Sequence, residues 1–541
     1  MRGRVFKATA ACAAAILYCL VGSASARADG ITYHRVVGKG DAAPGTAAGI
    51  TFSGFAPPGI SPTGQVVFAG ALAGPGVNDS NGVGGWAGVP GSLALVMRKG
   101  SPAPGTNTTY GPLGGFAQLP PPVDSGGSVA FSASLNSGTP VDNGTWAGPP
   151  GGLVLVERFG EPAPGAGPGA LFTGILFTPT LNEGRVAFTG EMHGAVTDTN
   201  RQAIWAGPPT AIDMVARTGS PAPGANGATF ESLGGDPLLN AVGAVAFNGR
   251  LAGPGVTGTN ADGIWLGPAG ALQLAVRAGT AAPGTNKTFA AVGPSGLNAR
   301  NQIVFAAQLL DGQGRLDGGS IWAGAPGSLR LVAEGGSPAP GTGGTFIALI
   351  TQPGINDLGQ VVFTGTADRG NGNFINGIWA GTPDALSRVA LVGDAAPIGG
   401  TVPAHFSFVE SPWINNAGQV AFVASVDADD GSFENKLSVW VRDALGLLHL
   451  VAREGGTIDV NGQPLTIRVL EVGAEIGFGA GGTGAGRPAP FNDAGQLVFQ
   501  AYFETDTALF VATVPVPEPG ALAGLAGCGL LLPRPSRRRR S

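Results

Sequence analysis

The stretch NDLGQVVF, residues 356–363, is one of eight copies of a single motif in this chain of 541 residues. The motif has the form N-x-x-G-x-V-x-F, with a shortened third copy, and every copy ends on a phenylalanine. These are Phe68, Phe131, Phe188, Phe247, Phe305, Phe363, Phe422 and Phe499. They are spaced by 63, 57, 59, 58, 58, 59 and 77 residues, and this regularity indicates an array of eight structural repeats.

Each repeat is expected to form four short strands. Val and Phe two residues apart lie on one face of a strand, and the Asn and Gly before them favour a tight turn. A second motif, commonly IWAG, a third of the form L-x-L-V-x-R-x-G-x-P-A-P-G and a short Thr-Phe segment complete the repeat. The second motif contributes Trp86, Trp146, Trp205, Trp265, Trp322, Trp379 and Trp440, with Phe510 in the eighth place. Such units are typical of propeller blades.

The two ends of the array predict a closed ring. The last repeat has its first strand near residues 496–499 and its second near 508–512, but no third motif follows. Residues 31–45 are a third motif without the two that should precede it. Pairing of these segments would leave no exposed sheet edge. The sequence therefore predicts an all-β, eight-bladed β-propeller closed by its N-terminal strand. The alternatives are an open β-array and two packed sandwiches.

Composition limits the classes of partner and chemistry. Gly 95 and Pro 44 are numerous, but 43% of residues are hydrophobic and only 12% are charged, so Gly and Pro separate strands rather than mark disorder. The net charge is −5 although both ends of the chain are basic, so the body is acidic and no nucleic-acid partner is expected. The three cysteines, Cys12, Cys19 and Cys528, lie outside residues 29–513, which excludes disulfides and cysteine chemistry there.

Residues 1–28 have the layout of a signal peptide. A basic start is followed by an apolar stretch and then by small residues, and cleavage is expected after Ala28. The repeat domain then covers residues 29–513, and a tail covers residues 514–541. The sequence accordingly predicts an exported protein.

The tail carries Pro517, Glu518 and Pro519, then an apolar run, then Arg537 to Arg540. It resembles the PEP-CTERM sorting signal. This resemblance implies a Gram-negative bacterium that makes exopolysaccharide and a sorting enzyme of the exosortase type as partner. It also implies a periplasmic or membrane-associated intermediate, transient membrane contact through the tail, and a final place at the cell surface or in the extracellular matrix.

The apolar run, residues 520–532, is shorter than the roughly 20 residues of a membrane-spanning helix, so its retention in the bilayer is expected to be weak or brief. The alternative is a frayed Pro- and Arg-rich terminus.

The repeats resemble the NxxGxVxF tandem-repeat proteins, which often carry a PEP-CTERM tail. The resemblance covers essentially the whole body. It implies no activity, so no functional residue is transferred from that family.

Equivalent positions in a ring lie on a circle, and the third motif places an arginine at five of them. These are Arg98, Arg158, Arg217, Arg277 and Arg453, with Gly38, Glu334 and Leu391 at the other three. One interpretation is an anion-binding annulus for acidic sugars, since guanidinium groups are planar donors. The alternative, which we favour, is that each arginine bonds loop carbonyls or nearby acids and stiffens its blade.

Loops between the first and second motifs are rich in Asp, Asn and Gly. The densest oxygen cluster is Asp427, Asp429, Asp430 and Glu434, and calcium accepts such ligands. The spacing does not match a known calcium loop, so solvated turns are the alternative. No other cofactor is expected.

A long insertion between Arg453 and Phe491 should cap the central channel or contact a partner.

Two classes of function fit these features. The leading one is a non-enzymatic surface or matrix protein whose rigid ring presents loops to exopolysaccharide or to another surface protein. The alternative is a propeller hydrolase or lyase acting on extracellular polysaccharide. An enzyme would need acids such as Glu157, Glu161, Glu191 and Glu231 to converge. A structural spacer is a third option. His34, His193, His405 and His449 fall in different repeats, and the chain has no H-E-x-x-H or G-x-S-x-G motif, which favours the non-enzymatic class. No catalytic residue is assigned.

Overall fold

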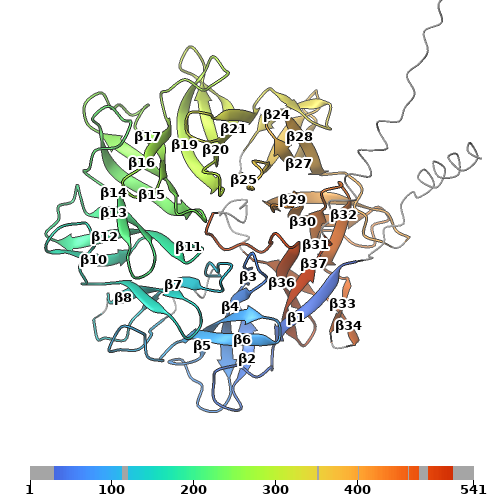
Figure 1. Ribbon diagram of the computed structural model, residues 1–541. Coiled ribbons are helices and arrows are strands. Elements are labelled where there is room, and N and C mark those ends of the chain that lie inside the picture. The colour runs from blue at the N-terminus through green and yellow to red at the C-terminus, as the bar shows by residue number, and fades with distance from the viewer. Residues whose placement is uncertain are drawn as a thin grey trace, which may run out of the picture.

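Eight antiparallel sheets stand around a ring (Figure 1). The structure, a computed structural model, describes residues 30–112, 120–139, 141–349, 353–399, 401–460, 462–473 and 485–515. The regular elements of this part of the chain are all strands. The prediction of an eight-bladed β-propeller is confirmed.

The first four blades follow the repeats in order. Blade 1 contains β2 (Thr51–Phe55), β3 (Gly59–Ile60), β4 (Val66–Ala73), β5 (Val83–Val89) and β6 (Ser92–Arg98). Blade 2 contains β7 (Val129–Ser134), β8 (Asn143–Gly148) and β9 (Val154–Arg158). Blade 3 contains β10 (Ala170–Ile175), β11 (Thr180–Asn182), β12 (Arg185–Gly194), β13 (Gln202–Gly207) and β14 (Asp213–Arg217). Blade 4 contains β15 (Thr229–Leu239), β16 (Val245–Ala252), β17 (Asp262–Gly267) and β18 (Gln273–Arg277).

The remaining blades repeat the same order. Blade 5 contains β19 (Thr288–Leu297), β20 (Ile303–Leu310), β21 (Leu316–Gly324) and β22 (Arg330–Glu334). Blade 6 contains β23 (Pro338–Ala339), β24 (Gly344–Ala348), β25 (Gly354–Ile355), β26 (Val361–Asp368), β27 (Phe374–Thr382) and β28 (Ala385–Leu391). Blade 7 contains β29 (Ala404–Ile414), β30 (Val420–Ala428), β31 (Lys436–Arg442) and β32 (Leu448–Arg453). A hairpin of β33 (Thr457–Val460) and β34 (Gln463–Thr466) precedes blade 8, which contains β35 (Val469–Val472), β36 (Gln496–Tyr502), β37 (Thr507–Thr513) and β1 (Thr32–Gly38).

The aromatic motif residues form the core between blades. In blade 1, Phe68 lies opposite Trp86, both are fully buried, and their rings stack with centroids 6.1 Å apart. Blade 8 repeats this pairing with Phe499 opposite Phe510, as the sequence predicts. Burying aromatic side chains of this size contributes roughly 2 kcal/mol each.

The tryptophans also join neighbouring blades by hydrogen bonds. In five blades the indole Nε1–H donates, at 2.9–3.0 Å, to the carbonyl of the proline in the Ala-Pro-Gly segment of the preceding blade. The pairs are Trp86–Pro44, Trp146–Pro104, Trp205–Pro164, Trp265–Pro223 and Trp379–Pro340. The bond gives the Ala-Pro-Gly segment a structural role at these five blade junctions, whereas Trp322 and Trp440 donate to Ser320 and Ser438 of their own strands.

The ring is closed by β1. This strand pairs antiparallel with β37, from Thr32 opposite Thr513 to Gly38 opposite Ala508. Val36 and Val37 are buried in the core that β37 shares with blade 1. The predicted pairing of the orphan third motif with the truncated last repeat is therefore confirmed.

The Asn-x-x-Gly turns gather around the ring axis. We call them the turn ring; it comprises residues 61–65, 124–128, 182–185, 240–244, 298–302, 356–360, 415–419 and 492–496. The short strands β3, β11 and β25, which lead into three of these turns, lie toward the centre in Figure 1. In each blade the strand that carries the phenylalanine of the Asn-x-x-Gly-x-Val-x-Phe motif begins at the turn and runs away from it.

Buried asparagines bond one turn to the next. Each donates from Nδ2, at 2.9–3.0 Å, to the backbone oxygen of the equivalent residue in the following blade. The series runs from Asn240 to Asn298, Asn356, Asn415, Asn492 and then Ser61. Its last bond joins the final repeat to the first, so the hydrogen-bonded series crosses the point of closure.

Candidate functional site

The insertion in blade 8 reaches the centre of the ring. It separates β35 from Phe491, which bridges to Leu497 next to the turn ring. Ala485 accepts a hydrogen bond from Leu239 N and Gly486 accepts one from Leu181 N, in blades 4 and 3. Ala489 accepts one from Ile60 N in blade 1. Residues 485–490, which we call the plug, cross the centre in Figure 1. The insertion therefore contacts the neighbouring blade 1 and the distant blades 3 and 4.

A charged pair accompanies the plug. The Arg487 guanidinium donates to the backbone oxygen of Asp236 at 3.3 Å, and within the described residues its buried Nε and the Asp236 Oδ1 have no hydrogen-bond partner. Burial raises the pKa of the Asp236 carboxyl, although the nearby positive charge of Arg487 opposes this shift. Burial also lowers the pKa of Arg487. This arrangement holds the plug against blade 4.

The five predicted arginines lie far from the turn ring within their sheets. In blade 1, Arg98 stands opposite Gly84, whereas Val66, next to the turn, stands opposite Gly88. Arg158, Arg217, Arg277 and Arg453 end their strands in the same register, opposite Gly144, Ala203, Gly263 and Ser438. The equivalent positions thus recur from blade to blade at that end of the sheet.

Three of these arginines hold loops with the same pattern of hydrogen bonds. Arg98, Arg217 and Arg277 each donate from Nε to the backbone oxygen of an asparagine 17 residues earlier, at 2.7–2.8 Å. The asparagine Oδ1 in turn accepts the backbone N–H three residues before it. These asparagines are Asn81, Asn200 and Asn260, and we call their surroundings the arginine-held loops.

The other two arginines are bound differently. Arg158 forms an ion pair with Asp142 at 2.7 Å, which holds the pKa of that carboxyl below its usual range. Arg453 lies over the Phe433 ring, 4.5 Å from the centroid. Arg98, Arg217 and Arg277 bond loop carbonyls and Arg158 bonds an acid. Bonds of this kind are those expected if the arginines stiffen their blades. The anion-binding annulus stays a prediction.

A cavity of about 590 Å³ adjoins one of the arginine-held loops. It lies between the last strand of blade 3 and blade 4, and Arg217, Asp213 and Ser220 supply its polar groups. Met214, Pro221, Pro223 and Leu272 are among its apolar lining residues. A second cavity, of about 670 Å³, lies beside the loop of blade 1 next to Lys99 and Asp79.

The acidic loop of blade 7 uses its carboxylates locally. Asp427 accepts bonds from Ser407 and Asn435, Asp429 lies 2.8 Å from His405 Nδ1, and Asp430 accepts from Ser432 N. Across the described ranges, no group of three or more His, Cys, Asp or Glu side chains could hold a metal ion. Calcium at this loop stays a prediction.

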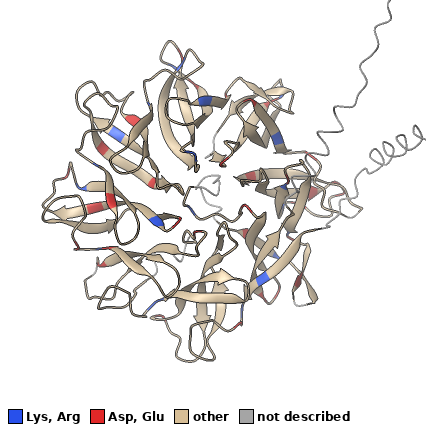
Figure 2. Cartoon of the chain, viewed as in Figure 1, with Lys and Arg blue, Asp and Glu red and all other residues tan. Residues whose placement is uncertain are grey.

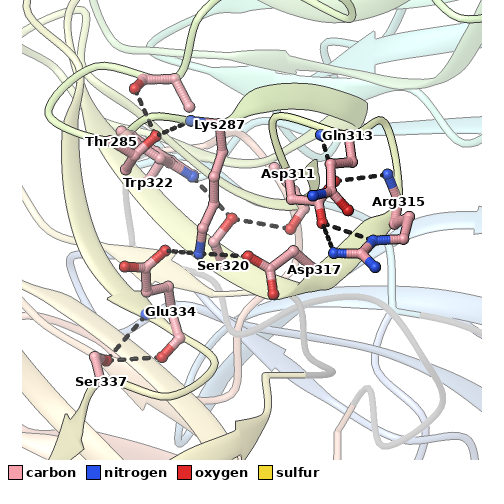
Figure 3. Close-up of polar contacts among 12 residues, drawn as sticks. Thr285, Lys287, Asp311, Gln313, Arg315, Asp317, Ser320, Trp322, Glu334 and Ser337 are labelled. Carbon is pink, nitrogen blue, oxygen red and sulfur yellow. Dashed lines mark hydrogen bonds and ion pairs between the residues drawn. The ribbon is translucent and has the colours of Figure 1, made fainter.

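Charged residues are scattered around the ring in small groups (Figure 2). One such group, in blade 5, was not anticipated from the sequence (Figure 3). Lys287 Nζ lies 2.9 Å from Glu334 and 3.0 Å from Asp317. The hydrogen bond to Glu334 is the main cause that raises the pKa of Lys287, so its amine stays protonated and is a poor nucleophile or base. The cluster occupies the position where other blades carry the arginine.

The sequence names Glu157 in blade 2 among the candidate acids but does not predict that it is buried. Glu157 is 3% exposed, and burial raises the pKa of its carboxyl to about 7. Its Oε1 accepts a bond from Thr145 Oγ1 at 2.7 Å, while Oε2 has no partner within the described residues. The equivalent residues in blades 1 and 3 are Met97 and Ala216, so only comparison between repeats would have singled it out.

The other acids and histidines named from the sequence do not meet at one place in the contacts of the described residues. Glu191 lies near Arg201 in blade 3, and Glu231 pairs with Arg250 in blade 4 at 3.1 Å. His193 stacks on Phe159, and His449 bonds Asp443. Each contact is confined to one blade or to two neighbouring ones.

The two ends of the chain are described only in part. The signal peptide with Ala28 and the motif Pro517, Glu518 and Pro519 lie outside the described residues. Val514, the first residue of the predicted tail, is buried and donates to Gly495 of the turn ring. Within the described residues no helix is long and apolar enough to cross a membrane.

Comparison of the sequence with known proteins finds a match to a protein family. A family model matches residues 23–267 and again residues 120–523, and that family is described as one of unknown function. No curated protein matches the sequence.

Solved structures resemble it only in fold. The β-propeller domain of the Trilobed protease from Pyrococcus furiosus is 10% identical, with a TM-score of 0.37 over 72% of this chain and 93% of that one. The Dos1 propeller is 10% identical, with a TM-score of 0.36 over 87% and 98%. The polysaccharide lyase Uly1 is 8% identical, with a TM-score of 0.33 over 76% and 94%.

Proposed function

The chain belongs to the family of unknown function DUF7453, and from that premise we propose that it is an exported, non-enzymatic binding scaffold of the cell surface or extracellular matrix. Its partner is an exopolysaccharide or another surface protein. The leader and the sorting-type tail support export, and the tail supports an exosortase-type enzyme as the processing partner and a periplasmic or membrane-associated intermediate.

One observation carries this proposal: three blades of a rigid ring present the same loop. In blades 1, 3 and 4 an arginine and an asparagine hold the loop by equivalent bonds of 2.7–2.8 Å. The loops expose hydroxyl and amide groups, such as the Thr197–Thr199 and Thr257–Thr259 pairs. Repeated polar groups at fixed positions suit a ligand that is itself repetitive, because each further contact is then intramolecular.

The stiffness of the ring supports the same conclusion. The turn ring and the Trp–Pro bonds tie each blade to its neighbours, and β1 closes the circle. Loops on such a frame lose little conformational entropy on binding, since they are already ordered.

The proposal is tested with the purified, leader-free protein on an array of bacterial polysaccharides. A parallel assay measures newly formed reducing ends or unsaturated sugar ends. Binding without release of ends is the expected result. Release of ends would establish the alternative, a propeller hydrolase or lyase. Absence of binding to every polysaccharide and to the surface proteins of the producing cell would contradict both. Heat-unfolded protein serves as the control for unspecific adhesion.

A further inference from the structure

The cavity between blades 3 and 4 combines a cation with an apolar floor. Arg217 and Ser220 supply polar groups, and Met214, Pro221, Pro223 and Leu272 supply aliphatic surface. Its volume of about 590 Å³ falls within the roughly 300–1,000 Å³ that is usual for small-molecule sites. A ligand for this cavity should therefore be both polar and partly aliphatic.

The charge of Arg217 is not neutralised by an acid in the described part of the chain. Its Nε and Nη1 donate to the backbone oxygens of Asn200 and Ala166, at 2.7 and 3.0 Å. By contrast, Arg158 at the equivalent position of blade 2 is paired with Asp142. Two neutral carbonyls fix the guanidinium plane and occupy two of its five N–H groups. The group is thus preorganised for an anion, and planar guanidinium matches carboxylate.

We propose that this cavity binds a uronic acid residue of an acidic polysaccharide. The sugar carboxylate lies on Arg217, and the C–H faces of the sugar ring lie on the proline and leucine side chains. The negative charge of Asp213, which lines the same cavity, repels the sugar carboxylate and so limits the affinity for a single uronic acid residue. The inference rests on the proposed scaffold function and names the ligand class for one of its sites.

The test measures binding of tri-galacturonate, and of neutral maltotriose as comparison, by calorimetry at low salt. The variants are Arg217→Gln, Arg217→Lys and Asp213→Asn. Arg277→Gln is the matched control, because Arg277 holds its own loop by the same bond at 2.7 Å but does not line the cavity. Melting temperature is recorded for all of them.

Loss of one charge-assisted contact should weaken tri-galacturonate binding about tenfold in Arg217→Gln, with a smaller loss in Arg217→Lys. Asp213→Asn should strengthen binding about threefold, because a like charge is removed. Arg277→Gln should lower the melting temperature as much as Arg217→Gln but leave the affinity nearly unchanged.

If Arg217→Gln and Arg277→Gln weaken tri-galacturonate binding equally, the cavity is not the binding site, and the arginine annulus is favoured instead. An unchanged affinity in both Arg217→Gln and Asp213→Asn would also overturn it. In either case the wild-type protein still binds, so the scaffold function stands. Binding of maltotriose alone overturns the acidic ligand class. If the wild-type protein binds neither sugar, the uronic acid site is overturned. The scaffold function itself fails only if the polysaccharides of the array and the surface proteins of the producing cell are not bound either.

Discussion

Single polar residues at the turn ring decide how firmly neighbouring blades are joined. Asn356 is 1% exposed; its Nδ2 donates to Asn415 O, while its Oδ1 accepts Leu358 N and Gln360 N from its own turn. The Asn-x-x-Gly motif thus serves turn formation and inter-blade bonding with one side chain. Removing that side chain leaves buried backbone groups without partners, which is more costly than removing an exposed contact.

We expect Asn356→Ala to lower the free energy of unfolding by about 3 kcal/mol, since several buried groups lose a partner. Leu358→Ala is the control in the same turn, because Leu358 is 54% exposed, and it should cost less than about 0.5 kcal/mol. Urea unfolding followed by tryptophan fluorescence measures both. Similar losses in the two variants would mean that the asparagine bond contributes nothing particular.

Glu157 should make stability depend on pH. Its pKa is about 7 in the folded protein, against 4.5 for an ordinary glutamate. The folded state therefore prefers the protonated acid, and stability present below pH 4.5 is lost as the pH rises toward 7. Relative to Glu157→Gln, the wild-type protein should lose about 3 kcal/mol between pH 4 and pH 8. Unfolding curves at a series of pH values measure this difference.

The control for this pH effect is Glu161→Gln, which changes an exposed glutamate four residues away. It should keep the pH dependence of the wild-type protein. A wild-type profile parallel to that of Glu157→Gln would show that the Glu157 carboxyl is not held in its protonated form.

At the scale of elements, the plug is the feature that most depends on close packing. Gly486 has a φ of +71°, and a Cβ at this position would lie 2.9 Å from Leu239 O and 3.2 Å from Leu181 O. Only glycine meets both demands, because it tolerates positive φ and leaves room for the two carbonyls.

Gly486→Ala should therefore destabilise the protein by about 2–4 kcal/mol, as strain and a clash add. Gly462→Ala in the β33–β34 hairpin separates the two causes: its φ is +81°, but no atom lies within 4 Å of the new Cβ. It should cost only about 1 kcal/mol. Unfolding free energies are measured for both, together with the rate of proteolysis near residue 485. Equal losses of unfolding free energy in Gly486→Ala and Gly462→Ala would show that Gly486 does not lie against Leu239 and Leu181.

The elements differ in how far the sequence could predict them. The Phe and Trp motifs predict strand positions and pairing correctly, because period-two patterns and turn residues act locally. The bonds from Asn240 to Asn298, or from Trp265 to Pro223, were not predicted, because they require the distance between blades. The contact of Ala485 with Leu239 was out of reach for the same reason: nothing local in an insertion tells which distant blades it meets.

The candidate site was predicted only in part. The recurrence of arginines at one position followed from the repeat spacing. Which of them pairs with an acid, as Arg158 does, and which lines a cavity, as Arg217 does, depends on loop conformations that the motif leaves free. The sequence names Glu157 only as one of four acids that an enzyme would need to converge, and it does not predict the burial of this side chain, which follows from blade packing.

At the scale of the whole molecule, stability depends on closing the ring. Without β1, the edge of β37 would be unpaired and the core around Val37 and Val511 exposed. Unpaired edges of this kind associate with other chains. We expect a variant lacking residues 30–45 to unfold at a lower temperature and to form oligomers.

Adding a synthetic peptide of residues 30–45 should restore the melting temperature in a concentration-dependent way, because binding to the folded state stabilises it. Calorimetry and size-exclusion chromatography measure the two effects. The control peptide has Val36 and Val37 replaced by Asp. A shortened chain as stable and monomeric as the full one would show that β1 is dispensable.

The meeting of the two ends at blade 8 has one more consequence. Thr32 lies opposite Thr513, and a Cβ on Gly30 would be 2.9 Å from the Pro515 ring. A short linker could thus fuse these ends, and the circle could be opened instead at an exposed loop of another blade, such as the one at Thr257. Such circular permutants would keep all eight sheets. Because the ring is closed, any of the eight repeats could stand first in the chain while the arrangement of the blades stayed the same.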